Sequence, residues 1–79
     1  MNIEQFNEKY KNYLEEGHYG LSVDGDEFIE WLDGQFEKFI TYPGFKFTQI
    51  KEKFGMGRFY CDGLPKELVN EVEDKISKL

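Results

Sequence analysis

Residues 45–61 read FKFTQIKEKFGMGRFYC, and this segment separates an α+β domain from a purely helical one. Phe, Thr and Ile favour strands, and they are frequent in residues 45–54. The sequence Gly55-Met56-Gly57 indicates a turn, after which residues 58–61 resume a strand-like composition. The segment therefore predicts a β-hairpin, with a bulge or a twist where the alternation of apolar residues slips between Phe47 and Ile50.

A first helix is predicted over residues 2–16, where apolar side chains recur at spacings of three and four. Asn2 and Gln5 have the spacing of a capping box at its start. Gly17 is placed to end it in a left-handed conformation. Residues 17–25 form a glycine-rich connection that permits a short extended piece.

A second helix is predicted to begin at Asp24, with Glu27 completing another capping box, and to stop at residues 42–44. Gly34 lies inside it and suggests a close approach of another element. A last helix follows Pro65, which suits the first turn of a helix. The expected apolar stripes are Phe28, Leu32, Phe36 and Phe39 or Ile40 in the second helix, and Leu68, Val72, Ile76 and Leu79 in the last.

The chain has 79 residues, which is enough for one small domain spanning residues 1–79. A two-stranded hairpin is marginally stable alone, so it must pack one face on the helices. Eight Phe, five Tyr and one Trp supply the core. We therefore predict an α+β fold in the order helix, helix, strand, strand, helix.

The composition argues against most kinds of catalytic or cofactor site. One Cys and one His allow neither an internal disulfide nor a tetrahedral zinc site. Cys61 is expected to be a half-buried thiol and His18 a surface residue. No glycine-rich phosphate loop is present. We expect a protein without metal, cofactor, membrane span or enzymatic activity, located in the cytoplasm.

Charge is distributed unevenly along the chain, whose net charge is -6. Residues 1–44 hold ten acidic and three basic side chains, whereas residues 45–64 hold four basic and two acidic ones. The plainest interpretation is a solvated helix surface together with charge pairing within the protein. The functional alternative is an acidic patch that meets a basic partner and is expected to face water. The residues of this acidic patch are Asp26, Glu27, Glu30, Asp33 and Glu37.

The hairpin interleaves basic and aromatic residues, a combination that can bind single-stranded nucleic acid by charge and stacking. The residues of this pattern are Lys51, Lys53, Phe54, Arg58, Phe59 and Tyr60. The alternative is that the aromatic residues belong to the core and the lysines only keep the protein in solution. The candidates are Lys51, Lys53, Arg58 and Tyr60. The net charge of -6 opposes direct nucleic-acid binding at long range.

The hairpin also resembles a motif of small phage and prophage proteins, written Q-[IV]-K-E-K-F-G-G-L-R-F-Y. The match is carried by QIKEKFG at residues 49–55 and by RFY at residues 58–60. Met56 and Gly57 depart from the pattern, and the C-terminal C-x-x-C of such proteins is missing, so no zinc role is carried over. The resemblance implies an origin in a mobile element and no established activity.

Together these features predict a non-catalytic phage-type binding protein. Its acidic patch would act as a nucleic-acid mimic and block a basic site on a host defence protein, such as a CRISPR effector, in the manner of an anti-CRISPR inhibitor. The alternative is a nucleic-acid-binding accessory protein that acts through the hairpin. Either would be a monomer or a homodimer.

Overall fold

The first helix, α1 (Ile3–Lys9), begins with the expected capping box. The Asn2 side chain accepts a hydrogen bond from the Gln5 N–H, and the Gln5 side chain accepts one from the Asn2 N–H, both at 2.8 Å. In the computed structural model, which describes all 79 residues, this helix ends well before residue 16. A short 3₁₀ helix, η1 (Lys11–Tyr13), follows it.

The early end of α1 has a cause in the sheet. Leu14 forms a parallel bridge with Phe47, and the Glu15 N–H donates to the Phe47 carbonyl at 2.9 Å. These backbone groups are therefore engaged with a strand and cannot continue a helix.

The second helix, α2 (Asp26–Phe39), starts two residues later than expected. Gly25 is its N-cap, with φ of 125° and no side-chain cap, so the capping box predicted at Asp24 is wrong. The predicted apolar stripe is confirmed, and Ile29 joins it. The buried residues of α2 are Phe28, Ile29, Leu32, Phe36 and Phe39.

Three strands form one sheet in the order β1-β2-β3. The strands are β1 (Gly20–Leu21), β2 (Lys46–Lys53) and β3 (Met56–Asp62). β1 and β2 are parallel, so α2 is the crossover between them, and β2 and β3 form the predicted hairpin. The bulge is confirmed by a shift in register between Phe47 and Gln49. The sequence allowed an extended piece near β1 but did not predict that it joins the sheet.

The hairpin turn lies one residue earlier than the glycines suggested. Lys53 pairs with Met56, which leaves Phe54 and Gly55 as a two-residue loop with φ of 55° and 79°. Two positive φ values match a type I′ turn, whose twist suits a hairpin. Met56 and Gly57, expected in the turn, belong to β3.

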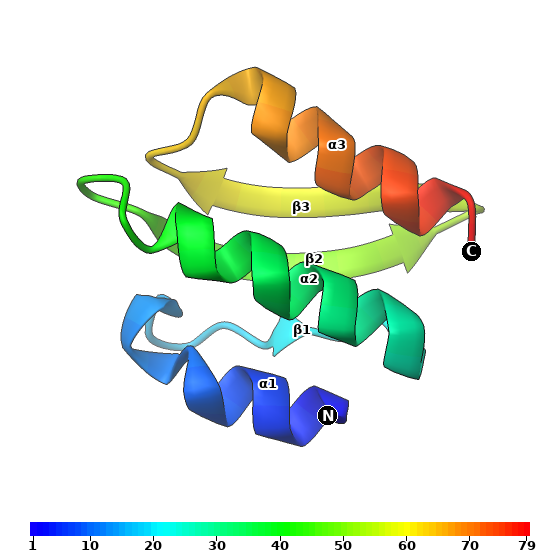
Figure 1. Ribbon diagram of the computed structural model, residues 1–79, viewed down its shortest axis with the longest axis horizontal. Coiled ribbons are helices and arrows are strands. Elements are labelled where there is room, and N and C mark those ends of the chain that lie inside the picture. The colour runs from blue at the N-terminus through cyan, green and yellow to red at the C-terminus, as the bar shows by residue number, and fades with distance from the viewer.

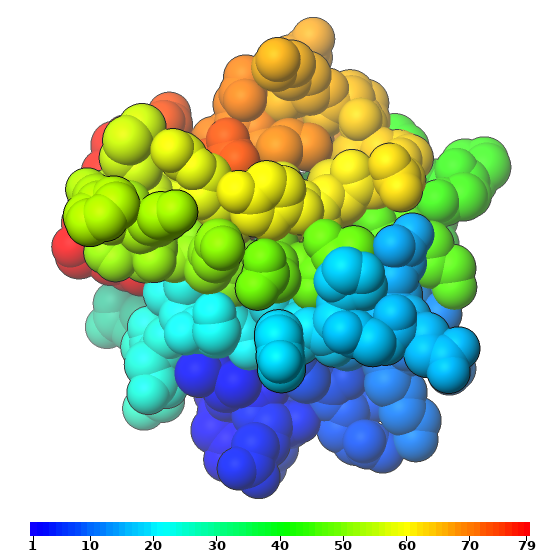
Figure 2. Space-filling view, turned by 180° about the vertical axis from the view of Figure 1, so that it is seen from behind, coloured from blue at the N-terminus to red at the C-terminus, as the bar shows by residue number.

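The last helix, α3 (Lys66–Ser77), follows Pro65 as predicted, and Pro65 is its N-cap. Val72 and Ile76 are buried, whereas Leu79 is 66% exposed and does not extend the stripe. The helices lie in front of the sheet, with α1 beside β1 and α3 along β3 (Figure 1). Seen from behind, residues of the three strands form the surface between α1 and α3 (Figure 2).

The core lies between the helices and the near face of the sheet, and it contains 15 buried apolar residues. Phe36 is at its centre. Its ring lies within 6.0 Å, centroid to centroid, of six other aromatic rings, those of Phe6, Tyr10, Phe39, Phe45, Phe47 and Phe59. The predicted α+β class, with strands packed on helices, is confirmed. None of the three helices has the length and apolar character that crossing a membrane requires.

The β1 edge of the sheet is covered by one side chain from α1. The Asn7 side chain donates to the Leu21 carbonyl at 3.0 Å and accepts from the Leu21 N–H at 2.9 Å. The amide of Asn7 therefore bonds to β1 as a neighbouring strand would.

The β3 edge is covered by two side chains of α3. The Gly57 N–H donates to the Ser77 hydroxyl at 2.8 Å, and the Phe59 N–H donates to the Glu73 carboxylate at 3.0 Å. The close helix approach that the sequence suggested at Gly34 occurs at Gly57 instead. A Cβ at Gly34 would meet nothing within 4 Å, whereas one at Gly57 would overlap the backbone of α3.

Candidate binding surfaces

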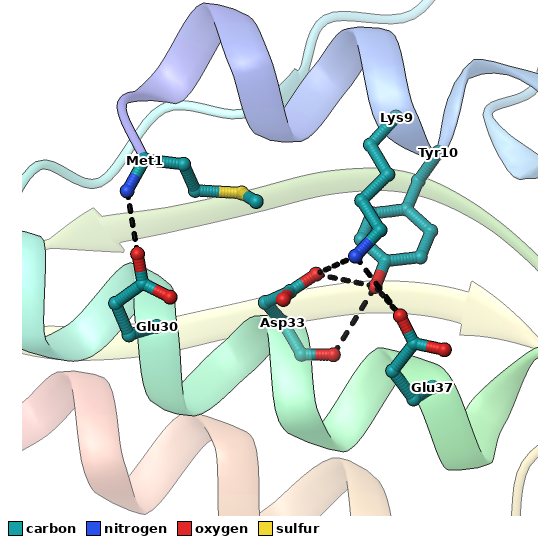
Figure 3. Close-up of polar contacts among 6 residues, drawn as sticks. All are labelled: Met1, Lys9, Tyr10, Glu30, Asp33 and Glu37. Carbon is teal, nitrogen blue, oxygen red and sulfur yellow. Dashed lines mark hydrogen bonds and ion pairs between the residues drawn. The ribbon is translucent and has the colours of Figure 1, made fainter.

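The five residues of the acidic patch all come from α2, but they do not share one environment. Asp26, Glu27, Glu30 and Glu37 are exposed, whereas Asp33 is half-buried. Three of the five make ion pairs with the N-terminal segment, which Figure 3 shows in close-up. The expectation that Glu30, Asp33 and Glu37 simply face water is therefore wrong for Asp33.

Asp33 and Glu37 hold α2 to α1 through the end of α1. The Lys9 ammonium lies 2.9 Å from a carboxylate oxygen of each residue. The hydroxyl of the buried Tyr10 donates a hydrogen bond to Asp33 Oδ1 at 2.5 Å (Figure 3). The same hydroxyl oxygen lies 3.3 Å from Glu37 Oε1. Periodicity alone placed these carboxylates away from the core. It could not show that α1 supplies a cation and a hydroxyl to them.

The ionisation of this cluster follows from its contacts. Partial burial alone would raise the pKa of Asp33, but hydrogen bonds from Tyr10 and Lys9 outweigh it and lower the pKa below its ordinary value. Hydrogen bonds to Asp33 and Glu37 raise the pKa of Lys9. Burial, followed by the bond to Asp33, raises the pKa of Tyr10. Lys9 and Asp33 are thus both charged at neutral pH and hold each other in place.

The remaining acidic residues are less engaged. Glu30 accepts a hydrogen bond from the Met1 ammonium at 2.6 Å, and this contact raises the pKa of that terminus. Asp26 and Glu27 make no ion pair. Five carboxylates with two cations, Lys9 and the terminus, leave the acidic patch with a net charge of -3.

Asp33→Asn is expected to reduce the free energy of unfolding by about 1–2 kcal/mol at pH 7, because it removes the charge from two hydrogen bonds. The lowered pKa of Asp33 means that its contribution is present above its unfolded pKa and disappears as the pH falls through the folded one. The difference between variant and parent should therefore shrink towards pH 3 in urea unfolding. Asp26→Asn, at an exposed unpaired site, is the control. An equal loss in both variants would contradict the role of Asp33.

The four hairpin candidates come together on the far side of the sheet. The register pairs Gln49 with Tyr60, Lys51 with Arg58, and Lys53 with Met56, and directly paired residues point to the same face. This face is opposite to the buried Ile50 and Phe59, and no helix covers it (Figure 2). We call it the open face and define it as Gln49, Lys51, Lys53, Met56, Arg58 and Tyr60.

The cations of the open face have no acidic partner. All four ion pairs of the protein lie on the helical side, and none includes Lys51, Lys53 or Arg58. Lys51 Nζ lies 5.7 Å from the ring centre of Tyr60, which is 45% exposed. The open face thus offers three positive charges beside an accessible aromatic ring.

One prominent residue at the end of this surface belongs to the basic and aromatic pattern of the hairpin but was not among the four candidates chosen from that pattern. Phe54, at the tip of the hairpin, is 92% exposed, and Lys53 Nζ lies 5.9 Å from its ring centre. Aromatic residues are usually assigned to the core, as Phe59 correctly is. The signal that could have identified Phe54 is its position directly before Gly55, because a two-residue hairpin loop excludes its first residue from the core.

The other chemically reactive side chains are unremarkable in their surroundings. Cys61 is half-buried as expected, and burial followed by the charges of Asp62 and Glu73 raises the pKa of its thiol to about 11. The thiol is therefore protonated at neutral pH and a poor nucleophile. His18 is exposed, as expected.

Comparisons with protein-family models, with curated proteins and with solved structures found no match.

Proposed function

We propose that the protein is a non-catalytic binding protein whose open face takes single-stranded nucleic acid. The observation that supports this most is the grouping of Lys51, Lys53 and Arg58, without a carboxylate partner, beside the exposed Tyr60. From the sequence alone this function was the alternative to the inhibitor with an acidic patch. The contacts of Asp33 and Glu37 with α1 change the order, because they give two residues of the acidic patch a role within the fold.

Single strands suit such a face for two physical reasons. Their phosphates are attracted to the three cations, and their unpaired bases can stack on an aromatic ring. In some RNA-binding domains the exposed aromatic side chains of a sheet stack two or three bases. Eleven of the sixteen acidic side chains come from the three α-helices, and none is ion-paired with a cation of the open face, so they act on an approaching strand mainly by weakening its long-range attraction.

The dependence of binding on salt measures the number of phosphates contacted. Three contacts on a single strand give a slope of about -2 in a plot of log K against log salt, or roughly a 20-fold loss of affinity from 50 to 200 mM. Lys51→Ala and Lys53→Ala should each weaken binding of a short oligothymidine and reduce the slope by about 0.7. Fluorescence anisotropy of a labelled oligonucleotide gives both values.

Lys38→Ala is the matched control, because it removes the same charge from the exposed side of α2. It should leave the slope unchanged. If Lys38→Ala and Lys51→Ala weaken binding equally, the contact is diffuse and the open face is not the site. Absence of binding at 20 mM salt would exclude the proposal altogether.

A second candidate is the phage-type inhibitor, in which the acidic patch occupies a basic nucleic-acid-binding groove on a host defence protein. The net charge of -3 that remains on the patch, with Asp26 and Glu27 exposed and unpaired, favours it. The test is capture from a nuclease-treated lysate, with washes at low and high salt.

The variants for this capture must leave the ion pairs between α1 and α2 intact. Asp26→Lys combined with Glu27→Lys reverses the unpaired charges alone and should abolish capture. The control is Glu67→Lys combined with Glu71→Lys, on the exposed side of α3. If the Asp26→Lys, Glu27→Lys variant still captures the partner, the inhibitor proposal is wrong.

A further inference from the structure

The backbone of the hairpin tip adopts a conformation that its sequence disfavours. Phe54 has φ of 55° and is the one non-glycine residue with a positive φ in the protein. The first position of a type I′ turn strongly prefers Asn, Asp or Gly, because a bulky side chain crowds the backbone in the left-handed region. Phe at this position therefore carries strain that Asn would relieve.

The fold gains nothing visible from this phenylalanine. Its side chain is 92% exposed and touches none of the core rings. The turn is held by other groups. The Lys53–Met56 pair closes it, and the Gly55 N–H donates to Glu52 Oε1 at 3.1 Å. A strained residue that makes no contact stabilising the fold is typical of residues retained for binding.

The turn also sets the position of Phe54 relative to the open face. Phe54 follows Lys53 directly and lies at one end of the open face, whereas Tyr60 lies towards the other end, opposite Gln49. Lys51 and Arg58 form the pair between these two aromatic positions. An extended strand with phosphates at the cations would thus meet an aromatic ring at each end.

We infer that Phe54 is a pre-positioned stacking residue for an unpaired base, and that it makes the open face select single strands over duplex. This inference rests on the proposed function. The chemistry that favours a nucleic acid over an apolar protein surface is the cation beside each ring, since Lys53 lies next to Phe54 and Lys51 next to Tyr60. In a duplex the base faces are stacked on one another and are closed to the ring.

Phe54→Asn separates binding from folding, because its two effects have opposite directions. The variant should melt at an equal or higher temperature, since Asn tolerates the left-handed region. Its affinity for a ten-residue oligothymidine should fall about tenfold, the typical effect of losing one stacked base. Leu79→Ala removes another exposed apolar side chain and should change neither value.

A tryptophan probe reports the stacking directly. The protein has a single Trp, so Trp31→Phe combined with Phe54→Trp places the only indole at the tip. Oligothymidine should quench its fluorescence and bind with native affinity, whereas the same oligonucleotide annealed to its complement should bind at least tenfold more weakly.

The outcomes distinguish the inference from the proposed function. If Phe54→Asn binds like the parent while Lys51→Ala is weakened, the inference fails and the nucleic-acid site stands. Equal affinity for duplex and single strand also overturns it. If no variant or parent binds oligothymidine, and the tip instead captures a protein from nuclease-treated lysate, both fail.

Discussion

Phe36→Ala is expected to remove a large share of the protein's free energy of unfolding. The side chain is fully buried and its ring contacts six other aromatic rings, so the substitution leaves a large cavity where elements from both ends of the chain meet. Loss of a buried phenylalanine typically lowers the free energy of unfolding by about 3–5 kcal/mol. A domain of 79 residues has about 4–12 kcal/mol in total.

Circular dichroism with urea titration measures this loss. The chain supplies a matched control, since Phe54→Ala makes the same chemical change at a side chain that is 92% exposed. That control should be at least as stable as the parent. A Phe36→Ala protein within 1 kcal/mol of the parent would mean that the aromatic cluster repacks freely and that Phe36 is not its centre.

Gly57→Ala is the second large effect, and it acts on the contact between β3 and α3. A Cβ at this position would lie 2.7 Å from the Ile76 Cβ and would overlap the Glu73 carbonyl. Backbone cannot give way as a flexible side chain can, so α3 must move off the strand. This movement also breaks the hydrogen bonds that the Gly57 and Phe59 N–H groups of β3 donate to Ser77 and Glu73. We expect a loss of about 2–4 kcal/mol from overpacking and the broken bonds.

Gly34→Ala is the control for this prediction, and its expected effect has the opposite sign. A Cβ there meets nothing within 4 Å, and alanine favours a helix interior over glycine by about 0.5–1 kcal/mol. Trp31 provides a local readout, because Lys75 of α3 lies 5.3 Å from its ring centre. Displacement of α3 should change the emission of Trp31 in Gly57→Ala alone. A Gly57→Ala protein with native stability and emission would contradict the close packing.

The parts of the fold that the sequence predicted are those determined locally. The stripe of α2, the bulge after Phe47 and the capping box at Asn2 each depend on residues a few positions apart. β1 could not be predicted in the same way. It has two residues, and its pairing of Gly20 with Gln49 joins segments far apart in the chain. The same holds for the glycines, because only the tertiary structure shows that α3 packs on Gly57 and leaves Gly34 free.

The open face shows how much depends on the position of a turn. A three-residue turn over 55–57 would pair Phe54 with Arg58 and place Lys51 on the same face of the hairpin as Phe59. One face would then combine a side chain suited to the core with a side chain suited to water. The observed turn changes the register by an odd number of residues and puts Lys51 with Arg58 and Tyr60. Composition could therefore identify the cations and aromatics as candidates, but only the register brings them to one face.

The side chains that cover both sheet edges also decide how this protein can meet other molecules. Asn7 occupies both backbone groups of Leu21 in β1, and Ser77 and Glu73 occupy the N–H groups of Gly57 and Phe59 in β3, so an incoming chain finds these positions of each edge already engaged. Both edges are therefore less able to template the addition of identical copies in a fibre. A ligand must instead be recognised through side chains, which gives chemical selectivity that main-chain pairing cannot provide.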